Sequence, residues 1–251
     1  MPIAGLQLGL ECGGSDALSG ITANPALGVA SDLLVAAGGT SILAETPELI
    51  GAEQILASRA VNPEVARQVI EVITDFESAI RELGVDVRGA QPTPGNQAGG
   101  LTTIEEKSLG AAKKAGDAIV SGVVEFAERP AFAGLHIMDT PGHDIEQLVA
   151  MVAGGCNIVA FTTGRGTPTG NAVVPVVKIA TNTPIFDRMP GDIDINGGAI
   201  LDGEVTLPAM GRLIFDFIIA AANGRATSAE RRSTMNSHLA GRFSPPPRLR
   251  T

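Results

Sequence analysis

Short apolar runs alternate with helical patterns along most of the chain, and this alternation constrains the fold more than any other feature. Buried strands are expected at residues 40–44, 135–138, 157–161 and 173–179. Caps and apolar spacing predict helices at residues 30–37, 47–58, 63–83, 145–153 and 207–222. Strands separated by helices are typical of a parallel sheet covered on both faces. We therefore expect an α/β domain in three layers, with a mostly parallel sheet.

Polar residues and glycines follow the expected strands at the points where the strands end. Glu45 and Thr46 follow the first of these strands, and similar polar turns occupy residues 139–143, 162–170 and 181–184. In open α/β sheets the ligand site lies outside the carboxyl ends of the strands. Because four separate strand ends carry this chemistry, the sequence predicts a polar functional site at that edge.

The richest polar stretch is residues 11–28, ECGGSDALSGITANPALG. It combines the Cys12 thiol, hydroxyls such as that of Ser15, the Asp16 carboxylate and the Asn24 amide with glycines that permit close approach to the backbone. Each polar side chain taken singly is also compatible with a simple helix or turn cap. Taken together, they favour a binding site.

Composition limits the class of protein. The chain has 251 residues, 44% hydrophobic and only 3% aromatic, so its core must be aliphatic. The formal charge of −9 argues against nucleic-acid binding, which depends on basic contacts to phosphates. Residues 225–251 contain six Arg and one Glu, and we expect a single domain over residues 1–224 followed by this basic, Pro- and Ser-containing tail, as a flexible or docking segment.

The sequence also indicates where in the cell the protein is expected. The longest apolar runs, such as residues 213–222, are too short to span a bilayer, so no membrane association is expected. The two cysteines, Cys12 and Cys156, are far apart in sequence and no signal peptide is evident, so reduced thiols and a cytoplasmic location are expected. Cys156 lies within an apolar run and is expected in the core.

Several side chains could carry chemistry, each with a structural alternative. Arg165 could hold a carboxylate through two parallel hydrogen bonds, or could brace carbonyl groups. Lys107 falls early in a helix capped by Thr102 or Thr103, where a cation is unfavourable unless it has an anionic partner. Cys12 is either a reactive thiol or a small buried residue. With Asp16 and Glu45 it could contribute to a divalent-metal site, although no spacing rule demands one.

Nucleotide binding is not indicated. The chain contains no phosphate-binding P-loop, and residues 164–166 (GRG) lack the remaining spacing of a dinucleotide fingerprint. The hydroxyls, amides and Arg165 suit a small, anionic, hydroxyl-rich ligand instead.

Several of these blocks resemble the altronate/galactarate dehydratase family. The blocks, in family order, are residues 11–28, 30–40 (ASDLLVAAGGT), 45–48 (ETPE), 95–96 (GN), 99–103 (GGLTT), 106–110 (EKSLG), 138–142 (MDTPG), 161–166 (FTTGRG), 181–184 (TNTP) and 194–196 (DIN). They extend from about residue 9 to residue 224. The resemblance is to the C-terminal portion of a family that also contains sulfolactate sulfo-lyase large subunits.

The resemblance implies a Rossmann-like hydro-lyase that removes water from a sugar acid to give a 2-keto-3-deoxy acid, with a divalent metal, Fe²⁺ or alternatively Mn²⁺. On this basis we expect Asp16, Lys107 and Arg165 to be catalytic, the first two as acid/base candidates. The expected substrate-binding or loop-organising residues are Ser15, Asn24, Asn96, Thr163 and Asn182. The expected metal ligands are Cys12 and Glu45.

Two alternatives remain open at this point. One is a sulfolactate sulfo-lyase large subunit, which would expel sulfite from an analogous carbon. The other is a non-catalytic subunit that requires a partner carrying the metal site, because family members carry an N-terminal domain and a middle region besides this portion. We accordingly expect a homo-oligomer or a complex with a small N-terminal-type subunit.

Overall fold

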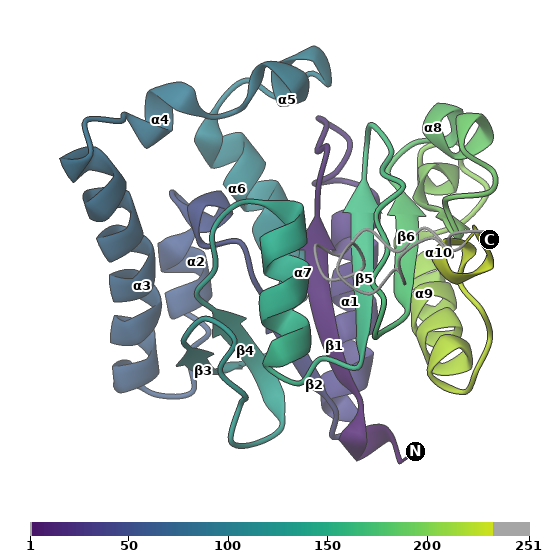
Figure 1. The fold of residues 1–251 in the computed structure, drawn as a ribbon, viewed down its shortest axis with the longest axis horizontal. Helices are drawn as coiled ribbons and strands as arrows, with labels where there is room; N and C mark the ends of the chain where they lie inside the picture. Colours follow the sequence, from purple (N-terminus) through teal and green to yellow (C-terminus); the bar gives the residue numbers. More distant parts are fainter. Residues whose placement is uncertain (1, 233–251) are drawn as a thin grey trace, which may run out of the picture.

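A parallel sheet forms the middle layer of the computed structural model, which describes residues 2–232 (Figure 1). Across these residues the sheet has seven strands in the order β3-β4-β2-β1-β5-β6-β7. They are β1 (Gln7–Cys12), β2 (Thr40–Leu43), β3 (Val120–Val124), β4 (Gly134–Met138), β5 (Ile158–Thr163), β6 (Val176–Ala180) and β7 (Ile195–Asn196). All neighbouring strands pair in parallel, so the expected α/β fold is confirmed.

Helices connect the strands. They are α1 (Ala23–Ala36), α2 (Glu53–Ala57), α3 (Pro63–Glu82), α4 (Val87–Ala90), α5 (Pro94–Ala98), α6 (Ile104–Ala112), α7 (Asp144–Ala153), α8 (Thr183–Arg188), α9 (Leu207–Ala222) and α10 (Ser228–Arg232). Four short 3₁₀ turns add η1 (Ile3–Gly5), η2 (Thr46–Leu49), η3 (Lys113–Ala115) and η4 (Gly197–Ile200) within the described residues.

The two faces of the sheet are covered by different helices. One face packs Leu8 and Leu10 of β1 against an aliphatic core shared with α1 and α9. The other face packs Phe161 of β5 against Met151 of α7. Gly9 permits this close approach, since a Cβ at Gly9 would lie 2.8 Å from the Met151 sulfur. Small and aliphatic side chains thus build the three layers, as the near absence of aromatics requires.

Several predicted boundaries differ from the structure. β1 was not predicted because Gly9 and the buried Glu11 interrupt its apolar pattern. The helix expected at residues 30–37 begins at Ala23, so the polar stretch 11–28 contains the end of β1 and the first turns of α1. Residues 47–58 form η2 and α2 rather than one helix. The strand expected at 173–179 begins only at Val176, immediately after Pro175.

The last described residues pack against the sheet. The Ser228 backbone N–H at the start of α10 donates to Asp194, whose buried side chain also accepts from the Lys178 N–H of β6. The first part of the basic tail, residues 225–232, therefore joins the domain, whereas residues 233–251 lie outside the described part of the chain. None of the helices in residues 2–232 combines the length and hydropathy needed to cross a bilayer.

Candidate functional site

The loops that follow β1, β2 and β4 meet at the carboxyl edge of the sheet. The Thr46 hydroxyl donates to Asp139 at 2.6 Å, and the Thr140 N–H donates to the Thr46 hydroxyl at 3.0 Å. The Glu45 N–H donates to the Thr140 hydroxyl at 2.8 Å. Glu45 itself has φ of 74°, a conformation that is uncommon and costly for a residue other than glycine. The two loops after β2 and β4 thus fix the backbone from which the Glu45 side chain projects.

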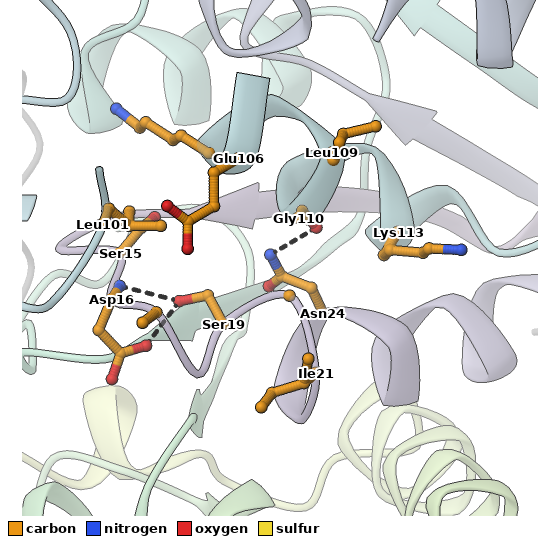
Figure 2. Close-up of a pocket in the computed structure, with 13 residues that line it drawn as sticks. Ser15, Asp16, Ser19, Ile21, Asn24, Leu101, Glu106, Leu109, Gly110 and Lys113 are labelled. Atoms are coloured by element: carbon orange, nitrogen blue, oxygen red, sulfur yellow. Dashed lines mark hydrogen bonds between the residues drawn. The ribbon is translucent and has the colours of Figure 1, made fainter. Parts of the chain in front are cut away.

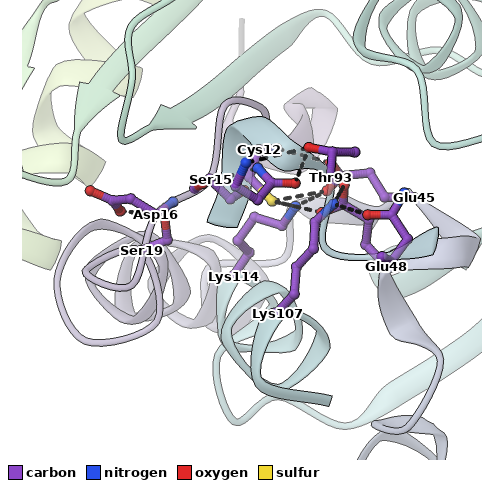
Figure 3. Close-up of polar contacts among 11 residues, drawn as sticks. Cys12, Ser15, Asp16, Ser19, Glu45, Glu48, Thr93, Lys107 and Lys114 are labelled. Atoms are coloured by element: carbon purple, nitrogen blue, oxygen red, sulfur yellow. Dashed lines mark hydrogen bonds and ion pairs between the residues drawn. The ribbon is translucent and has the colours of Figure 1, made fainter. Parts of the chain in front are cut away.

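Beside these loops lies a cluster of opposite charges around a thiol, which we call the thiol cluster (Figure 3). Its members are Cys12, Glu45, Glu48, Lys107 and Lys114. The Lys114 ammonium is fully buried, lies 2.9 Å from the Cys12 sulfur and pairs with the Glu45 carboxylate. The Cys12 sulfur is also 3.4 Å from Glu45 Oε2 and 3.5 Å from Glu48 Oε2.

Lys107 forms the outer part of the thiol cluster. Its helix, α6, begins after Thr103, whose hydroxyl accepts the Glu106 N–H, while Glu106 accepts the Thr102 N–H. Of the two threonines expected to cap this helix, Thr103 is the cap, and Glu106 reaches back to the residue before it. The Lys107 ammonium lies 2.8 Å from Glu48 and 3.0 Å from the Gln91 side-chain oxygen. Lys107 thus has the anionic partner that its position in the helix calls for.

Burial raises the pKa of three acidic groups in and next to the thiol cluster. Burial raises the pKa of the Cys12 thiol to about 12, and the nearby Lys114 ammonium lowers it only in part. Burial also raises the pKa of Glu11 well above its usual value, with Lys114 opposing the shift. Both Glu11 carboxyl oxygens are buried without a hydrogen-bond partner in the described structure. Burial likewise raises the pKa of Asp144, which begins α7 on the other side of Gly13.

Three side chains of the thiol cluster could share a metal ion. One ligand atom each from Cys12, Glu45 and Glu48 lies within 4.8 Å of the others. A thiolate with two carboxylates is a donor set compatible with a first-row divalent metal such as Fe²⁺. The Lys114 ammonium beside them balances one of the three negative charges. The residues present therefore fit the expected metal, with Glu48 as a ligand that the sequence analysis did not name.

A second polar group surrounds Asp16, and Figure 2 shows its contacts with Ser19. Its carboxylate accepts hydrogen bonds from the Ser19 hydroxyl at 2.9 Å, the Thr181 hydroxyl at 2.9 Å and the Asn182 amide at 3.1 Å. Gly164 leaves room for this carboxylate, since a Cβ there would lie 2.2 Å from its carbon. Asp16 therefore connects the loops that follow β1, β5 and β6, and its oxygens are already engaged.

The predicted amide and hydroxyl residues mostly hold loops together. Asn24 donates to the Gly110 carbonyl and accepts from the Thr162 hydroxyl. Asn96 donates to the Ser15 carbonyl at 3.0 Å and accepts from the Thr93 hydroxyl. Asn182 caps α8, and Thr163 accepts the Gly166 N–H. Their positions suit the organising role that was one of the two expected for them.

A pocket of about 240 Å³ opens next to Asp16 (Figure 2). Ser15, Asp16 and Asn24 line one side of the pocket, and Lys107 and Lys113 line the other. It joins the Asp16 group to the α6 side of the thiol cluster. The sequence-predicted residues Ser15, Asp16, Asn24 and Lys107 therefore share one concave surface.

Arg165 follows β5 and is exposed. It makes no ion pair within residues 2–232. Its guanidinium lies beside Gly95, where a Cβ would be 2.4 Å from Nη1. Arg165 is thus a cation available to an anionic ligand, held against the α5 segment.

Sequence reasoning missed Lys114 and Glu48. Lys114 lies in a Lys-Lys pair that reads as solvated surface, and nothing local signals its burial. Glu48 could have been found from its spacing, because it follows Glu45, the residue before η2, by one 3₁₀ turn, and its N–H donates to the Glu45 carbonyl. Cys156 is buried in the core as expected. His136 is also buried, with one ring nitrogen 3.0 Å from the Phe132 carbonyl oxygen.

Comparison with known proteins assigns the chain to a family. Residues 3–242 match the model described as D-galactarate/Altronate dehydratase, C-terminal. Altronate dehydratase of Bacillus subtilis (strain 168) is 43% identical over 231 residues, which cover 92% of this chain and 46% of that protein. Galactarate dehydratase (L-threo-forming) of Escherichia coli (strain K12) is 40% identical over 246 residues, which cover 98% of this chain and 47% of that protein.

A third relative is named for a different activity. The (2R)-sulfolactate sulfo-lyase subunit beta of Chromohalobacter salexigens is 38% identical over 231 residues, which cover 91% of this chain and 59% of that protein. The chain thus spans about half the length of the two dehydratases and somewhat more of the sulfo-lyase subunit. All three relatives are named as lyases. The chain therefore belongs to the D-galactarate/altronate dehydratase family and corresponds to its C-terminal region.

Proposed function

We propose that this chain is the C-terminal catalytic region of a sugar-acid hydro-lyase. The observation that carries the proposal is the thiol cluster, which places a buried thiol, two carboxylates and two ammonium groups at the carboxyl edge of a parallel sheet in a member of this family. Charged groups held in a low-dielectric edge site are what stabilisation of a developing carbanion requires.

The reaction we propose loses water from neighbouring carbons of an altronate- or galactarate-like acid. A base removes the proton next to the carboxylate, and the electron pair of that C–H bond becomes the double bond of an enol. Hydroxide departs from the adjacent carbon with a proton and leaves as water. The enol then takes up a proton at carbon and becomes the 2-keto-3-deoxy acid, so no oxidant or reductant is needed.

In this proposal Cys12, Glu45 and Glu48 hold a divalent ion, Fe²⁺ or alternatively Mn²⁺. When bound, such an ion supplies a Lewis acid that stabilises negative charge on substrate oxygens. Lys114 orients the Glu45 carboxylate and the Cys12 sulfur from the protein side. Two of these ligands are fully buried, whereas Glu48 sits at the more open end beside Lys107.

Substrate binding and proton transfer are assigned to Arg165 and to two residues that line the pocket, Lys107 and Asp16. Arg165 binds the substrate carboxylate, because it is exposed and has no acidic partner among the described residues. Lys107 is the first acid/base candidate, since it lines the pocket and its ammonium pairs with Glu48. Asp16 keeps the loops in register through three side-chain hydrogen bonds, and we retain it as the second acid/base candidate.

The test is product formation by the full chain. Purified protein is incubated without oxygen, with Fe²⁺ or Mn²⁺, and with a panel of hexonates and hexarates, and 2-keto acid is measured. We expect keto acid from at least one of them, and a large rise in KM in Arg165→Met. Arg188→Met, which removes an exposed arginine on α8, is the matched control and should leave KM unchanged. A folded, metal-loaded chain that forms no keto acid from any of them would contradict a self-sufficient dehydratase.

A sulfo-lyase is the second candidate, favoured by the relative named as a sulfo-lyase subunit. Sulfite release from sulfolactate in the same assay would select it. That relative is named as a subunit, and the chain spans only part of each relative, so a partner subunit or domain is part of this proposal. Activity that appears only when the rest of a dehydratase relative is added would identify this chain as a partner-dependent subunit. Its reduced, buried thiols suit a cytoplasmic enzyme.

A further inference from the structure

An acidic groove lies between α3 and β3. Figure 1 shows that these two elements lie at the opposite edge of the sheet from α10. The volume of the groove is about 560 Å³. Five carboxylates line it, and no lysine or arginine does. They are Glu71, Asp75, Glu125, Glu128 and Asp139.

The floor of this groove is apolar. Val72, Phe76 and Ala79 of α3 face Val123 and Val124 of β3 there. β3 is the terminal strand of the sheet, since its only strand partner within residues 2–232 is β4. The outer side of β3 is bridged at Val120 by Ala60, through the N–H of Val61 and the carbonyl of Arg59. The groove therefore offers an apolar floor with acidic walls beside a sheet edge that is paired only at its start.

Most of the groove's negative charge is not neutralised by the described residues. Elsewhere on α3, acids pair with arginines, as Glu77 does with Arg88 at 2.8 Å. In the groove Glu71 pairs with Arg67, but Asp75 and Glu125 take part in no ion pair within residues 2–232. Like charges held close together repel unless a cation joins them, so the groove favours a cationic partner.

We propose that residues 233–251 of the same chain dock in this groove. That segment contains Arg242, Arg248 and Arg250 and no acidic residue. Its arginines alternate with apolar Phe243 and Leu249, which matches acidic walls above an apolar floor. Charge complementarity of this kind sets partner choice at interfaces.

The segment is long enough to reach the groove. It starts after Arg232, which lies 3.3 Å from Asp192 near the β6–β7 side of the sheet. Six strand spacings of about 4.8 Å separate the two edges, or ~29 Å. Fully extended at ~3.3 Å per residue, residues 233–251 span ~60 Å. Docking within one chain is also favoured by the high effective concentration of a tethered segment.

The test uses spin labels on the full chain and measures the distance between them. Labels are placed at Ser78→Cys, an exposed position on α3, and Thr251→Cys, while the native thiols of Cys12 and Cys156 are buried. We expect one short-distance population that disappears at high salt. Asp75→Lys combined with Glu125→Lys should reduce it about fivefold or more, because attraction between charges becomes repulsion. The matched control, Glu82→Lys, reverses an exposed charge on α3 outside the groove and should leave it unchanged.

Two results would overturn the proposal. One is a broad, long distance distribution that the groove variants do not alter. The other is a short distance that appears when two singly labelled chains are mixed, because docking would then be between copies. Far-ultraviolet circular dichroism of each variant confirms that the fold is intact. None of these variants touches the thiol cluster, so the result is independent of the proposed lyase activity.

Discussion

Replacing Lys114 by methionine tests whether the thiol cluster is an energetically coupled unit. Lys114 and Glu45 are both fully buried and form an ion pair, and the Glu45 Oε1 atom also accepts the Cys12 N–H at 3.3 Å. Lys114→Met leaves the Glu45 carboxylate buried without its counter-charge. Breaking a buried pair in this way costs about 3–5 kcal/mol of unfolding free energy.

A double-mutant cycle separates the contribution of the Lys114–Glu45 ion pair to the unfolding free energy from that of packing. Glu45→Gln removes the negative charge with little change in shape, and Lys114→Met/Glu45→Gln removes both charges. We expect the double variant to be more stable than Lys114→Met, with a coupling energy of about 2 kcal/mol or more. Urea unfolding in the presence of a chelator measures all four proteins in the same metal-free state.

Additive effects would refute this reasoning. If the two single variants sum to the double variant within about 0.5 kcal/mol, the residues act independently. The Lys114 ammonium would then not serve as the partner of Glu45. A matched reference is Lys113→Met, because Lys113 is the neighbouring residue and is not part of the thiol cluster; it should change stability by less than about 0.5 kcal/mol.

Three further predictions follow from the same contacts. Burial raises the pKa of Cys12 to about 12, so the thiol should resist alkylation at pH 8 in the native, metal-free protein and react only on unfolding. Mass spectrometry of the alkylated protein measures this, and rapid labelling of Cys12 in the native protein would contradict it. The raised pKa of Glu11 means that the native state binds its proton more tightly than the unfolded state, so stability falls as pH rises above the usual carboxyl value of about 4.3. The unfolding free energy should therefore fall by up to about 1.4 kcal/mol per pH unit, and Glu11→Gln should remove this dependence. Urea titrations at pH 5 and pH 7 measure it, and an unchanged pH dependence in Glu11→Gln would exclude Glu11 as its source. Gly164→Ala would drive a Cβ into the Asp16 carboxylate, 2.2 Å from its carbon, and should destabilise the protein by about 2–3 kcal/mol. Gly203→Ala, with open space around it but φ of 76°, should cost about 1 kcal/mol, and equal costs for the two variants would contradict the Asp16 contact.

The fold class was predictable because its signal is repeated along the chain. β2, β4 and β5 are short apolar runs between helical patterns, and the periodic helices α3 and α9 were placed to within a residue. β1 was missed although it is a central strand, since a parallel strand is expected to be continuously apolar and β1 carries the buried Glu11. β3 was missed because it is a half-exposed edge strand with a glycine in its middle.

The site was predictable in part for a different physical reason. Cys12 and Glu45 stand at strand ends, so topology alone places them at one edge of the sheet. Lys114 comes from η3, after α6, and its contact with Cys12 bridges 102 residues of sequence. No local pattern distinguishes it from its exposed-looking neighbour. Conversely, Asn24 and Asn96 carry polar groups that suit a ligand, but both side chains bind other parts of the protein: Asn24 binds α6, and Asn96 binds the loop after β1.

Cobalt substitution tests most directly whether the thiol cluster holds the metal of a sugar-acid lyase. Metal-free chain is titrated with Co²⁺ without oxygen, and the thiolate-to-cobalt charge-transfer absorption is recorded. We predict a saturable band at one equivalent that is lost in Cys12→Ser and retained in Cys156→Ser, the variant of the buried core thiol. A band that survives Cys12→Ser, or tight cobalt binding with no thiolate band in the wild type, would contradict the account.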